Sequence, residues 1–293
     1  MTALELARFA LYADLGLAFG VPAAAVLTRA QSNVDRLRPV LVLTVLICLP
    51  ISLLGYLLTV AEMAGAGLND LDWQLVRELT TGTAIGRAFL ARVGVLLIAA
   101  TFILRKPSNP MWLAMPAAVA LGTLAWSGHA AASEGMLAAP RLAFDILHLF
   151  AASIWLGALV LFLAMLSKAA GTQAATGGAL ARFAGIGGAL VVTLGLTGIA
   201  NLWFLAPPRD WLGLVQTGYG ALLSIKLVLF SAMLGLAGLN RFALVPRLVA
   251  SGNEDQGRFA VRALRISIAL EFVLALTILL VVARLGMLDP GGP

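Results

Sequence analysis

Long apolar stretches alternate with short polar connections along the whole chain. Eight of these stretches approach or exceed the roughly 20 residues that a helix needs to cross a bilayer. They fall at residues 6–27, 39–64, 84–104, 111–132, 142–166, 183–205, 219–240 and 263–285. The pattern predicts an all-α, polytopic membrane helical bundle of about eight transmembrane helices that forms one domain over residues 1–293. The longest connections, 65–83 and 241–262, are too short to fold alone.

The composition places the chain among membrane proteins. Hydrophobic residues make up 61% of it and charged residues 12%, whereas soluble domains have about 45–50% and 25%. A net charge of +6 would suggest nucleic acid in a soluble chain, but in a membrane protein the placement of the charges matters more than their sum. We therefore expect a lipid bilayer around the protein and no nucleic-acid partner. The lone Cys48 can form no internal disulfide.

Basic residues are concentrated in alternate connections. One set holds Arg29, Arg36, Arg38, Arg105, Lys106, Lys168, Arg182, Arg241, Arg247, Arg258, Arg262 and Arg265. The other set has fewer, mainly Arg8, Arg77, Arg141, Arg209 and Arg284, together with most of the acids. Because basic loops stay in the cytoplasm, both termini are predicted to lie outside, which means the periplasm for a bacterial inner membrane.

Only two histidines occur in the chain, His129 and His148, and they flank one predicted outer turn. An imidazole in lipid-like surroundings needs a partner, so it is more often a metal, proton or cofactor ligand than packing material. By residue count, His129 lies roughly one turn and His148 roughly two turns below the outer ends of their helices. Since a short turn makes these helices antiparallel neighbours, we expect the two imidazoles to approach each other.

Further candidate ligands surround the histidine pair. Asp145 precedes His148 by three residues on one helix face, so it can orient the imidazole or bind metal beside it. Glu134 and Met136 lie in the turn. Imidazole suits copper, zinc, iron and nickel, and a thioether favours Cu(I), although simple packing is the commoner role of a methionine.

Small residues near His148 predict a close helix contact. Ala152 and Trp155 continue the His148 stripe, and Gly157 follows closely. Small side chains let another helix approach, and the Gly16-x-x-x-Gly20 spacing has the same effect.

Three charged residues, Asp14, Arg92 and Lys226, fall roughly 10 to 12 Å below the outer boundary by residue count. An unpaired charge there is costly, so we expect Asp14 to bridge Arg92 or Lys226 and to hold helices together.

Polar residues also occur deeper in the predicted helices. Glu271 lies nearer the inner side, either as a relay point for a cation or proton or as a helix–helix hydrogen-bonding group. Thr193, Thr197 and Asn201 repeat every four residues. This stripe either lines a polar path or bonds to neighbouring backbone.

The histidine region resembles the copper-resistance protein D family, CopD or PcoD. The likeness is carried first by Ser127-Gly128-His129-Ala130, His148, Ala151-Ala152 and Trp155-Leu156-Gly157. Downstream it continues through Arg182-Phe183, Leu196-Thr197-Gly198-Ile199-Ala200-Asn201, Thr217-Gly218-Tyr219-Gly220 with Lys226, Leu239-Asn240-Arg241 to Pro246-Arg247, and Leu264-Arg265 to Glu271. It covers residues 110–290 well, while the first three helices fit only in number and apolar character.

The resemblance implies a multi-pass protein of the bacterial inner membrane with eight helices and a part in copper handling. Such proteins are commonly proposed to move copper from periplasm to cytoplasm with a periplasmic copper-binding partner, CopC. Some members carry that partner in the same chain. Here we expect copper as the ligand and a separate CopC-type donor.

Two other functions remain open at this point. Two histidines on adjacent membrane helices can supply both axial ligands of one haem b, which would make the chain an electron-transfer protein. The histidines can also bond only to neighbouring helices, in an assembly or scaffold protein. A nucleotide-binding loop is absent from the sequence, so no ATP is expected to drive transport. We predict no catalytic residues and no enzymatic activity.

Overall fold

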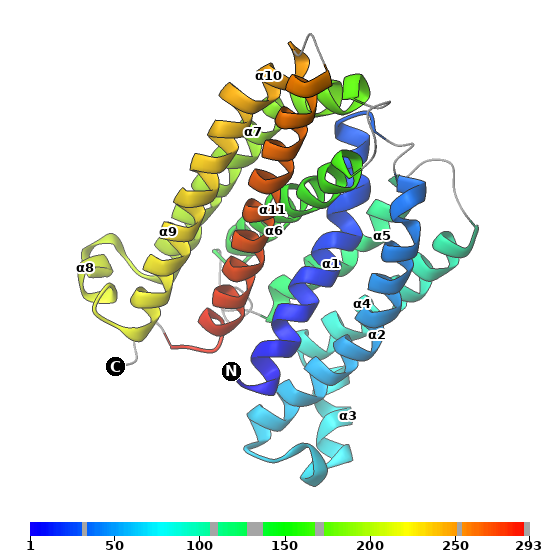
Figure 1. Cartoon of the computed structure of the whole chain (residues 1–293). Helices are drawn as coiled ribbons and strands as arrows, with labels where there is room; N and C mark the ends of the chain where they lie inside the picture. The colour runs from blue at the N-terminus through cyan, green and yellow to red at the C-terminus, as the bar shows by residue number, and fades with distance from the viewer. Residues whose placement is uncertain (31–33, 106–110, 128–136, 168–172, 251–253, 290–293) are drawn as a thin grey trace.

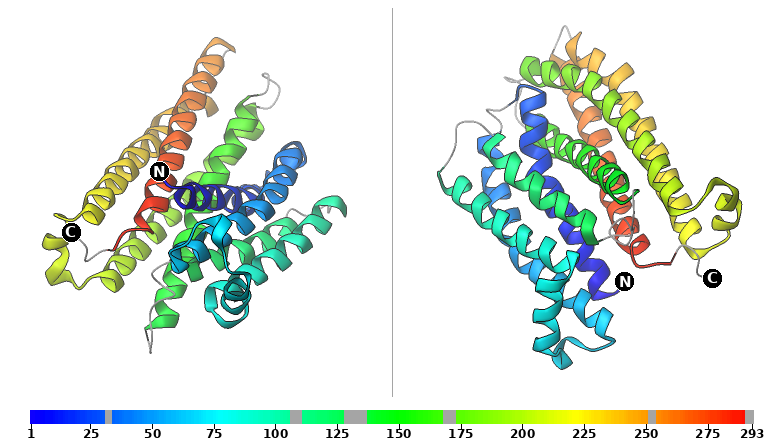
Figure 2. Two further views of the ribbon diagram at one scale, coloured as in Figure 1. Left: turned by 90° about the horizontal axis from the view of Figure 1, so that it is seen from below. Right: turned by 180° about the vertical axis from the view of Figure 1, so that it is seen from behind.

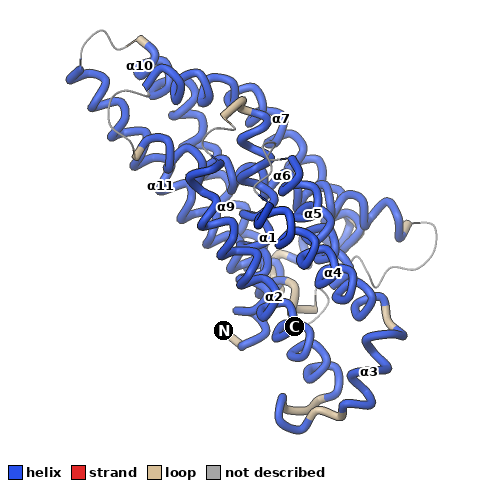
Figure 3. Tube along the Cα trace, turned by 90° about the vertical axis from the view of Figure 1, so that its right-hand side faces the viewer, coloured by secondary structure: helices blue, strands red, loops and turns tan. Residues whose placement is uncertain are grey.

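The computed structural model describes residues 1–30, 34–105, 111–127, 137–167, 173–250 and 254–289. Within these ranges the chain consists of helices joined by turns and contains no strand (Figure 3). Seven of the described helices are long and apolar enough to cross a membrane, and Met111–Trp126 is a shorter apolar one. The predicted all-α, polytopic membrane bundle is confirmed.

The long helices follow the predicted apolar stretches in order (Figure 1). They are α1 (Ala3–Leu27), α2 (Val34–Ala64), α4 (Ala84–Arg105), α5 (Met111–Gly122), α6 (Ala138–Leu166), α7 (Gln173–Leu205), α9 (Gly218–Leu239) and α11 (Glu254–Leu285). The short elements are η2 (Leu68–Asp70), α3 (Trp73–Gly82), η3 (Thr123–Ser127), η6 (Pro208–Asp210), α8 (Trp211–Leu214), η7 (Asn240–Leu244) and α10 (Val245–Val249).

Helix α1 crosses α6 in the middle of the bundle, and two glycines meet at the crossing (Figure 2). A Cβ added at Gly20 would lie 1.8 Å from the Ser153 carbonyl oxygen, and one added at Gly157 would lie 2.0 Å from the Gly20 carbonyl carbon. The two backbones are therefore in direct contact. The close approach predicted from Gly157 and from the glycine spacing in the first helix is confirmed.

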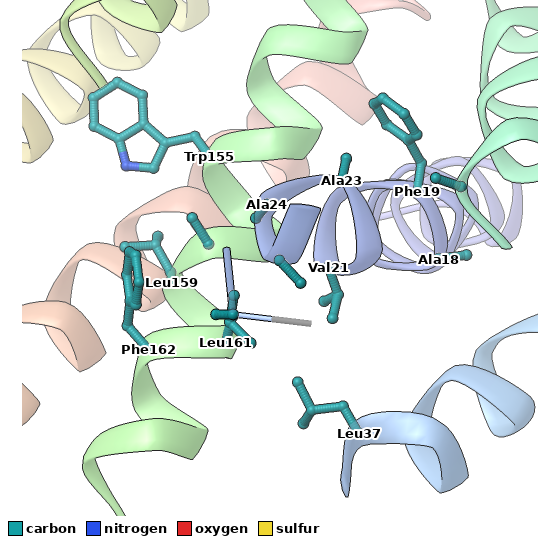
Figure 4. Close-up of a cluster of buried hydrophobic side chains, with 14 of the residues drawn as sticks. Ala18, Phe19, Val21, Ala23, Ala24, Leu37, Trp155, Leu159, Leu161 and Phe162 are labelled. Atoms are coloured by element: carbon teal, nitrogen blue, oxygen red, sulfur yellow. The ribbon is translucent and has the colours of Figure 1, made fainter. Parts of the chain in front are cut away.

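Around this crossing lies the apolar core, built mainly from α1 and α6 (Figure 4). Ala24 and Leu161 are fully buried, and Phe162 is 2% exposed. By contrast, the outer helices turn large apolar side chains outward; Val228 on α9, for example, is 70% exposed. Apolar side chains facing outward are the pattern of a protein surrounded by lipid.

Both ends of the described chain lie at the same end of the bundle. The start of α1, the last turn of α11, α3 and α8 are found there, and α10 lies at the opposite end (Figure 1). Arg8 donates a hydrogen bond of 2.9 Å from Nη1 to the carbonyl oxygen of Gly286, which joins α1 to the end of α11. The even number of crossings predicted for the chain agrees with this arrangement.

Two helix boundaries near the histidine turn differ from those expected. Helix α6 begins at Ala138 rather than at residue 142, so His148 lies about 15 Å from its start, nearly three turns deep. Helix α5 ends at Gly122 and continues only as the 3-10 turn η3. Arg92 donates to both the hydroxyl and the carbonyl oxygen of Thr123 at this end, which joins α4 to η3.

The stretch 241–262, predicted as a connection, is largely helical. Helix α9 continues through the π-helical η7 into α10, and α11 already begins at Glu254. The many charged residues in this stretch led to the prediction of a loop. Helices, however, extend readily into the polar zone beyond a membrane. The π-helical segment precedes Pro246, whose ring has no N–H to donate and clashes with the carbonyl four residues earlier.

Candidate functional site

His148 is held by a hydrogen bond between α6 and α7. Its Nδ1 lies 2.8 Å from the hydroxyl oxygen of Thr197, which is 3% exposed. The Thr197 hydroxyl in turn donates to the carbonyl oxygen of Thr193 at 2.6 Å. A hydroxyl has one proton to give, so it accepts from His148, and Nδ1 carries the hydrogen. In the neutral imidazole, Nε2 therefore keeps a free lone pair.

This arrangement matches the way proteins prepare a histidine for metal binding. Metal-binding imidazoles usually donate their second ring N–H to an oxygen, which fixes the tautomer and the ring orientation. His148 Nε2 makes no hydrogen bond to any described residue. The geometry leaves that nitrogen available to a ligand.

One turn toward the start of α6, Asp145 meets the next polar residue of α7. Asn201 Nδ2 lies 3.5 Å from the Asp145 carboxylate, a long contact. The Oδ1 atom of Asn201 is buried and has no hydrogen-bond partner among the described residues. Because an unpaired buried amide oxygen is costly, the site has a spare oxygen beside a carboxylate. The stripe predicted on this helix faces α6 at Thr197 and Asn201.

His148 lines two adjoining cavities between the helices. A polar cavity of about 240 Å³ includes Arg8, Tyr12, Arg141, Asp145, Tyr219 and Lys226 in its lining. A deeper, mainly apolar cavity of about 360 Å³ includes Lys226, Trp155, Phe230 and Met233. His148, Ala152 and Gly198 line both. The imidazole therefore lies where a cavity with several charged groups meets a mainly apolar one.

The charges around the polar cavity limit the ligand that fits there. Lys226 interacts electrostatically with Asp145 from across the cavity. Arg8 and Arg141 also line it, so three cations surround one carboxylate. Coulomb repulsion grows in proportion to the charge of a bound ion. The site is thus better suited to a monovalent than to a divalent cation.

A second polar cluster lies further from the start of α6. Trp155 is about 10 Å beyond His148 along the helix, and it points away from α1 in Figure 4. The Glu271 carboxylate of α11 lies within reach of its indole N–H. Asn240, at the start of η7, donates to the same carboxylate. Glu271 is 2% exposed, so this cluster is fully enclosed by protein.

Comparison with known proteins gives matches along nearly the whole chain. Residues 1–139 match the family described as Copper resistance protein D-like, N-terminal domain, and residues 177–285 match Copper resistance protein D. Copper resistance protein D of Pseudomonas syringae pv. tomato is 35% identical over 97% of this chain and 95% of its own length. This chain belongs to the copper resistance protein D family.

A second relative has a more distant sequence. Inner membrane protein YebZ of Escherichia coli (strain K12) is 28% identical over 78% of this chain and 77% of its own length. No solved structure matches the chain. Together with the seven apolar helices of the described part, the relatives establish a multi-pass protein of the bacterial inner membrane.

The copper resistance protein D likeness extends further than the sequence motifs indicated. Those motifs began near residue 110, whereas the family match includes the first helices. Helix α1 is the central helix of the bundle and contacts α6 of the other half. Its sequence is dominated by small and apolar residues, which carry a family likeness weakly when only one sequence is inspected.

The predicted ligands of this family member lie partly inside and partly outside the described ranges. His148 and Asp145 are described, while His129, Glu134 and Met136 lie outside the described residues. The predicted approach of the two imidazoles therefore stays a prediction. Asp145 contacts Asn201 rather than the His148 ring, because Thr197 already accepts from Nδ1. Thr197 therefore makes the contact that orients the imidazole, while the role of Asp145 as a metal ligand beside it stays a prediction.

The expected bridge from Asp14 is not formed in the described part of the chain. Arg92 is 4% exposed and donates from Nε to the Thr123 hydroxyl at 2.8 Å. Lys226 faces Asp145 instead. Residue count along a helix predicts the depth of a side chain but not the direction in which it points.

Sequence reasoning missed several residues that line the cavities. Tyr12, Arg141 and Tyr219 belong to the polar cavity, and Met233 belongs to the deeper one. Tyr219 lies in the Thr217–Gly220 family motif, which was a usable signal. Met233 is 5% exposed and lies in an ordinary apolar run, so nothing in the sequence distinguishes it from packing residues.

Proposed function

We propose that this chain captures copper at the periplasmic face of the inner membrane and moves it toward the cytoplasm. Membership in the copper resistance protein D family supports a role in copper handling. The observation that carries the finer proposal is His148, whose Nδ1 bonds to Thr197 and whose Nε2 has no hydrogen-bond partner among the described residues. In this proposal the chain is a carrier, and it catalyses no covalent chemistry.

The charge balance of the polar cavity favours Cu(I) as the transported ion. Imidazole nitrogen and thioether sulfur are suitable ligands for this soft monovalent ion. His148 supplies the nitrogen, and Met233 places a thioether in the deeper cavity. Lys226 repels a divalent ion twice as strongly as a monovalent one. His129, Glu134 and Met136 complete the proposed capture site from the outer turn.

The proposed direction rests on the placement of basic residues. The end of the bundle that carries α10 holds the arginine-rich connections, so it is assigned to the cytoplasm. The polar cavity lies toward the other end, where a separate periplasmic donor of the CopC type can deliver copper. Labelling tests this assignment. In a Cys48→Ser background, Asn69→Cys is expected to react with an impermeant thiol reagent added to intact cells, and Ala250→Cys only after lysis.

Copper binding and uptake test the capture site directly. The purified chain is titrated with Cu(I) and then reconstituted into vesicles for uptake. We expect His148→Ala to lower both the affinity and the uptake, by at least about tenfold for loss of a direct ligand. Leu147→Ala is the matched control, because it is the neighbouring residue on α6 and 49% exposed. Unchanged binding and uptake in His148→Ala would refute the proposal.

The same preparation also tests the haem alternative. A haem held by the two histidines gives a Soret absorption band that disappears in His129→Ala and His148→Ala. Our proposal predicts a protein without that band that binds copper. A histidine-dependent Soret band in the purified chain would replace copper capture with electron transfer.

A further inference from the structure

Glu271 is a buried carboxylate with no ion-pair partner in the described part of the chain. It lies near the middle of α11, about 21 Å from Leu285, and it is 2% exposed. Two arginines, Arg241 of η7 and Arg265 of α11 itself, are engaged elsewhere. Arg241 lies over the Phe242 ring, and Arg265 donates to the Leu166 carbonyl. A charge this deep in a membrane bundle is costly unless a cation neutralises it.

Two further buried oxygens near Glu271 also have no partner among the described residues. Asn240 gives its Nδ2 hydrogen to Glu271, while its own Oδ1 is buried without a hydrogen bond. Ser267, one helical turn from Glu271 on the same face of α11, has a buried Oγ without a hydrogen bond. Native proteins leave few such atoms unpaired, and each one requires an explanation. Together they supply an amide, a hydroxyl and a carboxylate oxygen.

The backbone at this cluster is interrupted as well. Asn240 opens the π-helical segment η7, where the Val245 N–H bonds to the Asn240 carbonyl five residues earlier. Such π-helical segments occur frequently at functional sites. Membrane transporters commonly bind their coupling ions where a helix departs from regular geometry. The position therefore combines an unusual helix with an uncompensated carboxylate.

The donor set defines the class of ion. Oxygen ligands suit hard cations, whereas copper(I) prefers nitrogen and sulfur. One carboxylate balances one positive charge. We propose that Glu271, Asn240 and Ser267 form a site for a small, hard, monovalent cation, either a proton or Na⁺, that is separate from the copper site at His148.

Trp155 connects this ion site to the space that His148 lines. The Glu271 carboxylate lies within reach of its indole N–H, while the same side chain lines the deeper cavity with His148 and stands edge-on to Phe230 at 6.1 Å. An ion that neutralises Glu271 removes the charge that the indole N–H contacts, which changes the wall of the cavity. The link to copper movement rests on the proposed function, whereas the ion site itself does not.

Infrared difference spectroscopy on the purified full chain tests the ion site without copper. A proton site gives a carboxylic-acid band that changes with pH, is absent in Glu271→Gln, and is unaffected by Na⁺. A Na⁺ site gives, in addition, displacement of that band by Na⁺ at constant pH and binding of radioactive Na⁺. A wild-type chain with no Glu271-dependent band and no Na⁺ binding would overturn the proposal.

Replacing Ser267 by alanine, with Ser52 as the control, tests the ion site with little change in packing. Ser267→Ala removes an oxygen that makes no hydrogen bond to a described residue, so a purely structural role predicts no change. As an ion ligand, its loss weakens ion affinity about tenfold, or shifts the proton midpoint, at an unchanged unfolding temperature. The control is Ser52→Ala on α2, whose Oγ is likewise buried and unpartnered among the described residues. Equal titrations for both variants and the wild type would exclude Ser267 from the site.

Vesicle experiments separate the ion site from copper transport. Copper uptake into vesicles is measured with and without an imposed proton or Na⁺ gradient. We expect a gradient to raise uptake by the wild type and to have no effect on Glu271→Gln. Uptake by the wild type that ignores both gradients would refute the coupling. A wild type that takes up no copper would refute the proposed function, while the infrared result stands independently.

Discussion

The two sides of α6 differ sharply in how they meet their neighbours. Toward α1, Gly157 brings the helix into backbone contact with Gly20, and a single added Cβ has no room. Toward α7 and α9, the same helix presents His148 and Trp155 to the cavities. A tightly fixed side holds the helix in place, so that the other side can keep an open space beside polar groups. Rigid packing and an adaptable site are thus combined on one helix.

A substitution that disrupts the contact between α6 and α1 should have the largest effect on stability. We expect Gly157→Ala to destabilise the fold by about 3 kcal/mol or more, since the new Cβ would lie 2.0 Å from backbone atoms that cannot rotate away. Thermal unfolding in detergent and the yield of monodisperse protein measure this loss. Gly94→Ala on α4 is the control, because nothing lies within 4 Å of a Cβ there. An unfolding temperature equal to that of the wild type would contradict the backbone contact.

On the side of α6 that faces α7, removing the Thr197 hydroxyl that positions His148 should weaken copper binding without unfolding the protein. Thr197→Val keeps the shape but loses the acceptor for Nδ1, and outer-shell changes of this kind lower metal affinity about 10- to 100-fold. Cu(I) titration checks this, with Thr197→Ser expected to restore affinity. Thr193→Val is the control, because its hydroxyl bonds only to the Ala189 carbonyl. Equal affinities in Thr197→Val and Thr193→Val would show that the hydrogen bond between His148 and Thr197 has no influence on copper binding.

The fold was predictable from sequence to a greater extent than the site. Apolar runs fix the number and order of the helices, because a bilayer demands a minimum length of apolar chain. His148 stood out because histidine is rare in this chain. Its partner Thr197 did not, since a threonine in a membrane helix usually bonds only to its own backbone. The direction of Asp14, Arg92 and Lys226 depends on helix rotation and crossing, and a hydropathy pattern contains no information about either.

Removing a positive charge from the polar cavity should have a smaller effect, and it should strengthen metal binding rather than weaken it. Lys226→Met removes a cation that faces Asp145, so binding of cations should improve. We expect a gain of about 1 kcal/mol for Cu(I), roughly fivefold, and a larger gain for Zn(II) because of its double charge. Competitive titration of the two metals measures the ratio. Lys226→Arg keeps the charge and should retain the wild-type ratio, while weaker binding in Lys226→Met would show that the lysine supports the site.

The smallest effect is expected from a second glycine-to-alanine substitution, at Gly198 on α7, which faces His148. A Cβ at Gly198 would lie 3.9 Å from Cε1 of His148, which is ordinary van der Waals contact. Gly198→Ala should therefore leave the unfolding temperature unchanged and alter Cu(I) affinity by no more than about twofold, below 0.5 kcal/mol. Gly157→Ala adds a methyl group on α6 where it faces α1, and Gly198→Ala adds one on α7 where it faces α6. If both variants lost stability equally, the side that faces α7 would be as closed as the side that faces α1, and the cavity beside His148 would have no room for an ion.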